Sequence, residues 1–562
     1  MEHLKLHTRH IPLEHLRLDV AMGRRVRNNG MCDVLNPEQL ARLKSLGVSI
    51  VETRLVWHEL EPEPGRFDWS RFERDITRIE AAGMAPAVFP WFQHPPAWEH
   101  DLIRARCLEH NHEISIPSLW DTRLIDAYDR LYGALAKQYG KRLRYIQACC
   151  YGDYGEVLYP IGVKHYKFNW GEGHFGFWCG DQLARADFRN RLQTQYGTLE
   201  KLNRSWGSSF RSWEDDLMPA IPFSQNTLRR RIDFAGWYSD SLLEFTDKAL
   251  ATMRKYFPDI EGGIAMGAPY EPLEVGQVKS RAAKLAAKYD LTPRWTAAAL
   301  FHKDVARSNL QARRISSAAR FYGKRFGTEA ALEMHDTVPA ICELAANGAT
   351  MFHNDPGNFE FSRECYAELL PQIPSGLPIC TPVAVFYPVE GEFCRCLDGE
   401  TDLEPQNENN FAETQQTLPR ERIDTFLDAC VELREKCDFE VIDSWMIADG
   451  VLEQFKILVL PCALPVPEAT ARRIGNWVKQ GGTLMVHRDR QPRILENSMP
   501  LSTFASLDGF SLVTVEQFPE VEPFTAFKQQ YGDDTLVFWH GDRVTLYSPG
   551  QEAVQIAVHC NL

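Results

Sequence analysis

The 562-residue sequence has no uninterrupted apolar segment of the roughly 20 residues that a membrane-spanning helix needs. Its first residues, Met1 to His7, lack the apolar core of a secretory signal. Basic residues are not in excess, because 62 Lys and Arg stand against 76 Asp and Glu, a formal net charge of −14. An acidic surface disfavours nucleic acid and anionic lipid as main partners. We therefore expect neither a membrane nor a nucleic-acid partner.

The 14 cysteines show no regular spacing and no CxxC repeat. Cysteine-based zinc sites normally contain such closely spaced pairs, so the sequence predicts no metal, and no motif in it calls for a cofactor. Adjacent Cys149 and Cys150, like Cys394 and Cys396, are too close in sequence for ordinary framework disulfides. We expect mostly reduced, buried thiols and a cytoplasmic location.

Over residues 1–375, short apolar runs alternate with amphipathic helical stretches. Residues 48–56 read as a strand, and 71–82 read as a helix, with apolar residues at helical spacing before Gly83. Further strands are expected at 85–90, 145–150, 262–266, 294–300, 324–328 and 349–352. Helices between successive strands imply a parallel sheet. So many units predict an α/β fold, a (β/α)₈ TIM barrel with insertions. A doubly wound sheet is the alternative.

The pattern changes after residue 375. Residues 376–495 combine four buried strands with two helices, which predicts a compact, flavodoxin-like α/β domain. Residues 496–562 carry only short apolar runs, which predict a small C-terminal β domain. The role of the acidic loop 390–416 cannot be read from the sequence.

In a barrel, reactive residues follow the carboxyl ends of strands. Glu156 lies in a glycine-rich turn after the fourth strand, and Glu329 directly follows the seventh. Glycosidic cleavage needs two such carboxylates: one protonates the departing oxygen, and the other attacks C1 or positions a water. The structural alternative at the first site is a turn with Asp153 as a cap. Glu333 and Asp336 are the fallback candidates for the second carboxylate.

Aromatic and basic side chains follow the same strand ends, where aromatic faces can stack on sugar rings and arginine can bind hydroxyls. Eight such residues form the expected substrate-binding wall: Arg54, Trp57, His58, Trp91, His94, Trp98, Trp178 and His353. Trp120 and His302 are weaker candidates. The carboxylate-rich segment from Glu61 to Asp68 reads better as a charged surface turn.

Three stretches of the sequence together resemble the family 42 β-galactosidases of glycoside hydrolase clan A. Residues 54–69 resemble the signature of that family's second strand, and 95–98 match its Pro-Pro-Ala-Trp motif. Residues 188–207 resemble a helical motif of the family and are the most specific match. The resemblance implies a retaining exo-β-glycosidase of short oligosaccharides or glycosides with Glu329 as nucleophile. It also implies a homotrimer assembled through the middle domain.

One departure from the family pattern concerns the acid. Family 42 places it in an Asn-Glu pair at the end of strand four, and this pair is absent. Residues 155–160 instead resemble the β-amylase acid loop, which makes Glu156 the acid/base. Family 42 enzymes retain anomeric configuration and β-amylases invert it, and we favour retention. The family's zinc-binding cysteines are not reproduced, although Cys107 and Cys179 could be remnants.

The substrate and the chemistry leave alternatives open. Related families of this architecture cleave β-mannosides as well as β-galactosides. An inverting, β-amylase-like hydrolase of α-glucans is the second hypothesis. A catalytically silent carbohydrate-binding protein on the same fold is the third.

Overall fold

The computed structural model describes residues 17–22, 24–27, 30–33, 35–160, 176–267, 273–295, 305–330, 347, 349–354, 381–393, 426, 430–431, 433–434, 438–461, 465–487, 492–497, 511–515, 536–540, 543–547 and 552–557. The chain divides into two compact units. The larger comprises Ile11–Leu377 with Cys394–Leu418, and the smaller comprises Met1–His10, Pro378–Phe393 and Pro419–Leu562. Each unit is described by itself below.

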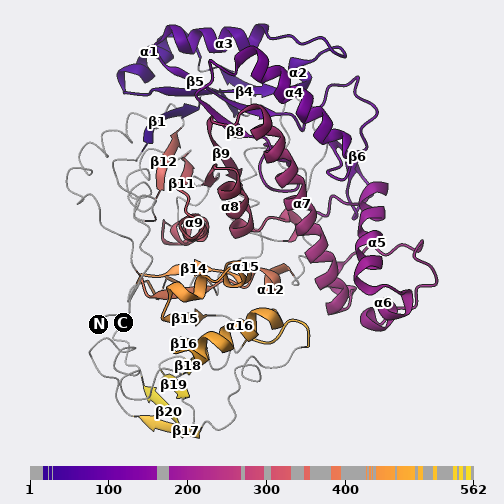
Figure 1. Ribbon diagram of the computed structural model, residues 1–562, viewed down its shortest axis with the longest axis vertical. Helices are drawn as coiled ribbons and strands as arrows, with labels where there is room; N and C mark the ends of the chain where they lie inside the picture. The colour runs from indigo at the N-terminus through magenta and orange to yellow at the C-terminus, as the bar shows by residue number, and fades with distance from the viewer. Residues whose placement is uncertain are drawn as a thin grey trace. The chain divides into compact units, whose positions relative to one another are not determined.

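Eight parallel strands close into a barrel in the larger unit (Figure 1). In chain order they are β1 (Arg17–Met22), β4 (Ile50–Val56), β5 (Ala85–Trp91), β8 (Tyr145–Ala148), β9 (Glu261–Met266), β10 (Thr292–Trp295), β11 (Phe326–Ala330) and β12 (Ala349–Asn354). The barrel closes because β1 pairs with both β12 and β4. The predicted α/β fold with parallel strands is confirmed, and the doubly wound alternative for this unit is wrong.

Helices follow the barrel strands, as the alternating pattern predicted (Figure 1). They include α1 (Pro37–Ser45), α3 (Ser70–Ala81), α4 (Arg123–Tyr139), α7 (Leu228–Tyr256), α8 (Lys279–Lys288) and α9 (Val305–Phe321). In α3 the buried apolar residues are Phe72, Ile76 and Ile79, so one stripe of the helix faces the core. Gly83 follows with a φ of 70°, a left-handed conformation that glycine adopts at little cost. No described helix combines the length and apolar character needed to cross a membrane.

Some predicted strand bounds differ from the structure. The strand predicted at 145–150 ends at Ala148, because the Cys150 N–H donates to Gly155 O (2.8 Å) and the chain turns there. The strand predicted at 294–300 is β10, which ends at Trp295, and residues 296–300 lie outside the described residues. The sequence pattern placed no first strand. In the structure β1 fills that place.

A layer of apolar side chains fills part of the barrel interior. It consists of Ile50, Ala87, Tyr145 and Met351, which pack against one another from four strands. Because side chains alternate along a strand, the residue two positions further projects into the same interior. Glu52 and His353 therefore lie inside the barrel, one layer beyond Ile50 and Met351. Both are buried.

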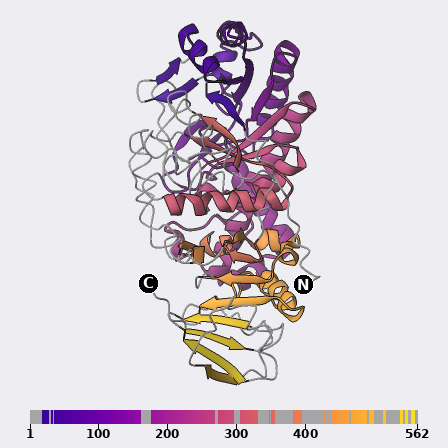
Figure 2. The ribbon, with the colours of Figure 1, turned by 90° about the vertical axis from the view of Figure 1, so that its left-hand side faces the viewer.

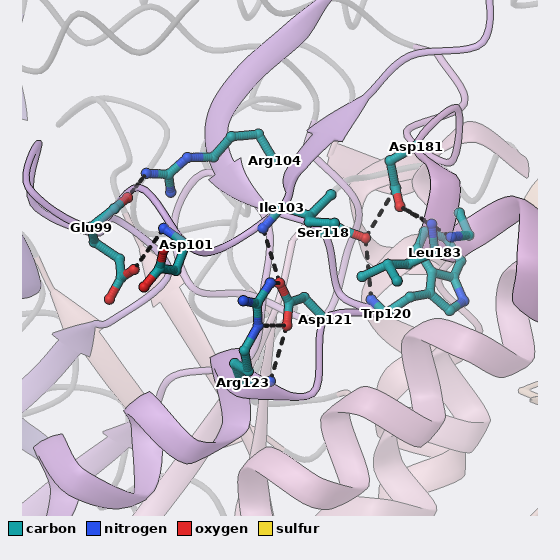
Figure 3. Close-up of polar contacts among 11 residues, drawn as sticks. Glu99, Asp101, Ile103, Arg104, Ser118, Trp120, Asp121, Arg123, Asp181 and Leu183 are labelled. Carbon is teal, nitrogen blue, oxygen red and sulfur yellow. Dashed lines mark hydrogen bonds and ion pairs between the residues drawn. The ribbon is translucent and has the colours of Figure 1, made fainter.

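An insertion after β5 contains the antiparallel pair β6 (Arg104–Arg106) and β7 (Glu113–Pro117). Figure 3 shows how its polar side chains hold it. The Asp121 carboxylate accepts from the Ile103 N–H (2.9 Å) and from Arg123 Nε (2.8 Å). Ser118 Oγ donates to Asp181 Oδ2 (3.0 Å), at the start of α5 (Gln182–Tyr196). These bonds bind the insertion to itself and to α5.

The insertion also reaches the carboxyl end of β8. Tyr151 Oη donates to Pro117 O (2.6 Å). Trp120 stacks on Trp237 of α7, with ring centroids 5.1 Å apart, and its Nε1 donates to Ser241 Oγ (3.3 Å). The insertion is therefore packed beside the strand end that carries the first candidate carboxylate.

The smaller unit contains one eight-stranded sheet of order β14-β13-β15-β16-β18-β19-β20-β17. The bounds are β13 (Val383–Phe386), β14 (Glu440–Ile442), β15 (Ile457–Leu460), β16 (Thr483–His487), β17 (Ser511–Val515), β18 (Leu536–His540), β19 (Arg543–Tyr547) and β20 (Glu552–Ala557). Three short or medium helices, α12 (Val389–Phe393), α15 (Ser444–Ala448) and α16 (Glu468–Lys479), belong to the same unit.

The last four strands of the chain continue this sheet and do not form a sheet of their own (Figure 2). β16 pairs in parallel with β18, from Leu484 opposite Leu536 to His487 opposite Trp539. The prediction of a separate β domain from residue 496 therefore needs correction. The pairing joins strands about fifty residues apart in sequence, and local composition carries no signal of such a contact.

The helical motif at 188–207 is held by one buried carboxylate, Asp233 of α7. It accepts hydrogen bonds from Trp206 Nε1 (2.7 Å), Gln195 Nε2 (2.8 Å) and Tyr196 Oη (2.5 Å). Trp206 ends α6 (Leu199–Trp206), so Asp233 links α5, α6 and α7.

We predict that Asp233→Ala lowers the free energy of unfolding of the larger unit by about 3 kcal/mol, because the buried Trp206 Nε1 and two part-buried donors lose their acceptor and Arg229 loses its ion pair. Urea denaturation followed by circular dichroism measures this change. Asp247→Ala, in the same helix, is the matched control. Asp247 pairs with Lys288 at the surface, where one ion pair contributes less than about 1 kcal/mol. Equal losses in the two variants would contradict the role given to Asp233.

Candidate active site

A tight turn at the end of β8 carries Glu156. The Tyr151 N–H donates to Glu156 O (2.9 Å), which folds the chain back on the strand end. Gly152 and Gly155 have φ values of 64° and 73°, a region that disfavours residues with a Cβ. The Val157 N–H donates to Ala265 O (3.0 Å), which attaches the turn to β9. Glu156 is 8% exposed.

The Glu156 carboxylate rests against a glycine. A Cβ placed on Gly267, just past β9, would lie 1.8 Å from Glu156 Oε2. Since no carbon can approach an oxygen that closely, this side-chain position requires glycine at 267.

A buried lysine lies close to Glu156. Lys279 Nζ donates to Gln277 Oε1 (2.8 Å), and Gln277 Nε2 donates to Val157 O (2.6 Å). Burial lowers the pKa of Lys279 to about 7, against the opposing influence of the Glu156 charge. Lys279 thus titrates near neutrality beside the turn.

Glu329 lies in β11 and contacts an arginine that the sequence analysis missed. Arg294 Nη2, from the neighbouring β10, lies 3.0 Å from Glu329 Oε2. Arg294 is 1% exposed, whereas the Glu329 side chain is 23% exposed. The carboxylate of Glu329 is therefore accessible while its arginine partner is enclosed by the barrel.

Two further buried groups contact the same arginine. Arg294 Nη1 donates to His353 Nδ1. Glu52 Oε2, from β4, lies 3.8 Å from Arg294 Nη1 and 3.7 Å from His353 Nε2. Since arginine only donates, Nδ1 of the histidine accepts, and the proton of a neutral ring is on Nε2, facing Glu52. Glu52 is also absent from the predicted site residues.

The electrostatics of this cluster are coupled. Burial raises the pKa of Glu52 to about 7, although Arg294 and Arg54 oppose the shift. Burial, together with Arg294 and Arg54, holds the pKa of His353 well below its ordinary value, so the ring is neutral. For Arg294, burial favours the neutral form, but Glu329 and Glu52 outweigh it and leave its pKa above the ordinary value. Glu156 also acts on Arg294, so both predicted carboxylates influence one guanidinium.

Arg54 and three aromatic or imidazole rings lie together beside the Glu156 turn. The Arg54 guanidinium stacks on Trp91, 4.3 Å from the ring centroid. Trp91 contacts Tyr154 of the turn (5.8 Å between centroids) and His94 (6.0 Å). His94 Nε2 donates to Asp153 O (2.9 Å), since a carbonyl oxygen only accepts. Among the described residues, Arg54 Nε and Nη1 have no hydrogen-bond partner, and both atoms are buried.

Trp57 and Trp98 do not join the Arg54 group but contact Glu61. Their indole N–H groups donate to Glu61, from Trp57 to Oε2 (2.8 Å) and from Trp98 to the backbone oxygen (2.8 Å). Arg130 of α4 binds both carboxylate oxygens of Glu61 at 2.7 Å. Glu61 is 1% exposed, so the interpretation of its segment as a surface turn is wrong at this residue. Its carboxylate joins the loop after β4 to α4.

The remaining predicted residues are spread over several places. His58 follows β4, and its N–H donates to His94 O (3.2 Å). Trp178 is fully buried, and its backbone N–H donates to Tyr238 Oη (3.0 Å) in the aromatic core beside α7. Three predicted residues lie outside the described residues: His302, Glu333 and Asp336.

Five cysteines are buried free thiols: Cys107, Cys149, Cys150, Cys179 and Cys430. The Cys107 sulfur accepts from the His112 N–H (3.3 Å). Within the described ranges, no group of three or more His, Cys, Asp or Glu could hold a metal ion.

Comparison with protein-family models matches residues 171–290 to a glycoside hydrolase family 42 model described as "Beta-galactosidase". A β-galactosidase from Arthrobacter sp is 24% identical over 233 residues, covering 40% of this chain and 31% of that protein. A thermophilic β-amylase from Thermoanaerobacterium thermosulfurigenes is 24% identical over 229 residues, covering 36% of this chain and 41% of that protein. The matched region thus spans only about a third to two fifths of these curated relatives. The relatives of both kinds are glycoside hydrolases by name.

Solved structures show the same two likenesses. A catalytic mutant of a family 42 β-galactosidase from G. stearothermophilus superposes with a TM-score of 0.61 at 15% identity, covering 88% of this chain and 74% of that one. The catalytic domain of a β-amylase from Paenibacillus polymyxa gives 0.50 at 19% identity, covering 63% of this chain and 98% of that one. At such identities the likeness shows the fold only. The predicted resemblance to both groups is confirmed.

We predict that stability depends on the ionisation of Glu52. Its folded pKa of about 7 exceeds the ordinary 4.5, so the protonated side chain is favoured by folding. This contribution is fully present below about pH 4.5 and is lost as pH rises through about 7, a change of about 3 kcal/mol. In Glu52→Gln the contribution does not change with pH. The unfolding free energy of wild type should therefore fall relative to that of the variant between those pH values. Parallel curves from urea denaturation at each pH would contradict the assignment.

Proposed function

We propose that this chain is a retaining exo-β-glycosidase, β-galactosidase-like or acting on a related sugar such as a β-mannoside. Glu156 is the acid/base and Glu329 the nucleophile. The observation that supports this best is that two carboxylates from the fourth and seventh barrel strands both act on the guanidinium of Arg294. Two carboxylates near one point of a barrel's carboxyl end are what glycosidic cleavage requires.

In the first step, Glu329 attacks the anomeric carbon and forms a glycosyl-enzyme ester. Arg294 contacts Oε2, so Oε1 is the oxygen that attacks. Glu156 gives its proton to the departing glycosidic oxygen. In the second step Glu156 takes a proton from water, and that water displaces Glu329 from the sugar.

Substrate binding falls to the group around Arg54. Arg54, which is 8% exposed, binds sugar hydroxyls, and the half-buried Tyr154, whose ring contacts the buried Trp91, supplies aromatic surface beside the Glu156 turn. The insertion held by Asp121 and Ser118 packs beside the same strand end, which supports an exo mode of cleavage with a closed end to the site. The substrate class is an oligosaccharide or glycoside.

A specific observation favours one alternative, an inverting hydrolase of α-glucans. The turn that carries Glu156 resembles the β-amylase acid loop in sequence, and the barrel aligns with almost the whole β-amylase catalytic domain. In that chemistry Glu329 would activate a water, which needs carboxyl groups about 6.5–9.5 Å apart, against about 5–5.5 Å for retention.

We further propose that the smaller unit is flavodoxin-like and assembles subunits. Its first four strands along the chain have the spatial order β14-β13-β15-β16, which corresponds to the 2-1-3-4 part of the flavodoxin-like order, and β18, the sixth strand along the chain, takes the fifth place. By resemblance to family 42, the assembly is a homotrimer.

The proposed function predicts hydrolysis of one or a few members of a panel of para-nitrophenyl α- and β-glycosides. Glu329→Gln should lose nearly all turnover, because the amide cannot form the ester intermediate. Glu156→Gln should lose most turnover. Proton NMR of the first-formed sugar separates the mechanisms, since retention releases the β-anomer from a β-glycoside. An α-glucan substrate with inversion would establish the alternative, and silence across both substrate classes would overturn the proposal.

We predict that Gly267→Ala separates activity from stability. The new methyl group must displace the flexible end of Glu156, so kcat should fall by about 100-fold, as small misplacements of catalytic groups do. The free energy of unfolding should change by only about 1 kcal/mol, because the displaced atoms are the end of a flexible side chain. Gly236→Ala, in α7, is the matched control, since its Cβ would meet nothing within 4 Å. Unchanged kcat in Gly267→Ala would argue against a catalytic Glu156.

A further inference from the structure

We propose that Arg294 is a positioning residue for Glu329, and that Glu52 and His353 hold Arg294 in the orientation this requires. The inference rests on the proposed function, because it concerns the residue assigned as nucleophile. It adds two groups, Arg294 and Glu52, that neither the sequence motifs nor the comparisons single out.

The first support is where the four residues lie. They come from four different barrel strands: Glu52 from β4, Arg294 from β10, Glu329 from β11 and His353 from β12. β11 pairs with both β10 and β12, and Glu329 lies directly opposite His353 in the ladder. Strand backbones in a closed barrel have little freedom, so the side chains meet at fixed distances.

The second support is how Arg294 divides its contacts. One terminal nitrogen, Nη2, lies 3.0 Å from the Glu329 carboxylate. The other, Nη1, donates to His353 Nδ1 and lies 3.8 Å from Glu52. A guanidinium is planar and rigid, so fixing one edge also fixes the direction of the other. Glu52 and His353 thereby set the direction from which Glu329 is held.

The third support is the balance of charge. Among the described residues, Arg294 and Arg54 are the cations that act on Glu52, and Glu52 and Glu329 are the carboxylates that act on Arg54. His353 is neutral, Tyr145 faces Arg294 from β8, and the Phe89 ring lies 5.7 Å from its guanidinium. Glu156 acts on Arg294 from the neighbouring turn. The enclosed guanidinium of Arg294 must be paired, and Glu329 is one of its partners. Removing Arg294 takes away the contact that orients the Glu329 carboxylate, which is then free to rotate away.

A lysine at position 294 cannot make the same set of contacts. Its ammonium is a single point on a flexible stem, so it can pair with Glu329 but cannot also fix a plane against His353 and Glu52. Arg294→Lys therefore keeps the charge and loses the geometry, which separates positioning from simple electrostatic attraction.

The test uses the full chain and the best para-nitrophenyl glycoside of the panel. Arg294→Met should lower kcat by about 100-fold, because the attacking carboxylate loses its orientation, and should change KM by less than about 3-fold. Arg294→Lys should recover only part of the lost kcat. Glu52→Gln should lower kcat by about 10-fold, since it removes one of two supports.

A double variant tests whether Glu52 acts through Arg294. If it does, Arg294→Met with Glu52→Gln has the kcat of Arg294→Met by itself, because the second change removes a support that no longer has a target. Multiplied effects would overturn the role given to Glu52. Arg254→Met is the matched control, because Arg254 binds only backbone oxygens, among them Tyr289 O (2.7 Å) and Ile260 O (2.7 Å). It should lose stability without a change in kcat.

The outcomes separate the inference from the proposed function. Wild-type turnover that Glu329→Gln abolishes, together with full kcat in Arg294→Met, overturns only the inference. Full recovery of kcat in Arg294→Lys does the same, since charge would then suffice. Wild type that turns over no glycoside, or turnover that survives Glu329→Gln, overturns the proposed function and the inference with it.

Discussion

The cost of enclosing charge inside a barrel constrains the whole candidate site. Arg294 is 1% exposed and Glu52 is 2% exposed, so neither side chain can rely on water. An enclosed charge is tolerated only where an opposite charge or a hydrogen-bonding group lies against it. Arg294 meets this condition through Glu329, Glu52 and His353. Glu329 is the most exposed member of the cluster, with a side chain 23% exposed.

The other candidate carboxylate, Glu156, is positioned in a different way. Glu156 is carried by a turn, and its place depends on two left-handed glycines and on Gly267, which leaves room for its carboxylate. The turn is joined to β9 by a backbone hydrogen bond and to Gln277 by a side-chain one. A strand thus positions one carboxylate and a bonded turn the other. The two supports are nevertheless linked by charge, because Glu156 also acts on Arg294.

The mixed likeness to β-galactosidases and β-amylases has a structural counterpart. Both groups use barrels, and the barrel superposes on both. Fold comparison at this identity does not distinguish the turn after β8 or the side chains of β10 and β11, which carry Glu156, Arg294 and Glu329.

Local sequence predicted the barrel strands after β1 and the glycine turn that carries Glu156. Helix α3 follows from the spacing of Phe72, Ile76 and Ile79, and the Glu156 turn follows from its glycines, because both depend on neighbours within a few residues. Tertiary structure decided the rest. The Arg294 cluster joins strands that begin as far apart as residues 50 and 349, and an arginine in a short apolar strand gives no local sign of its partner. The sequence predicted a surface position for Glu61, but its carboxylate is buried by contacts with Arg130 and Trp57. The sequence predicted a separate domain for the last strands, but the pairing of β16 with β18 joins them to the preceding sheet. In each case the deciding contact joins segments far apart in sequence, and its energy exists only once the chain has folded.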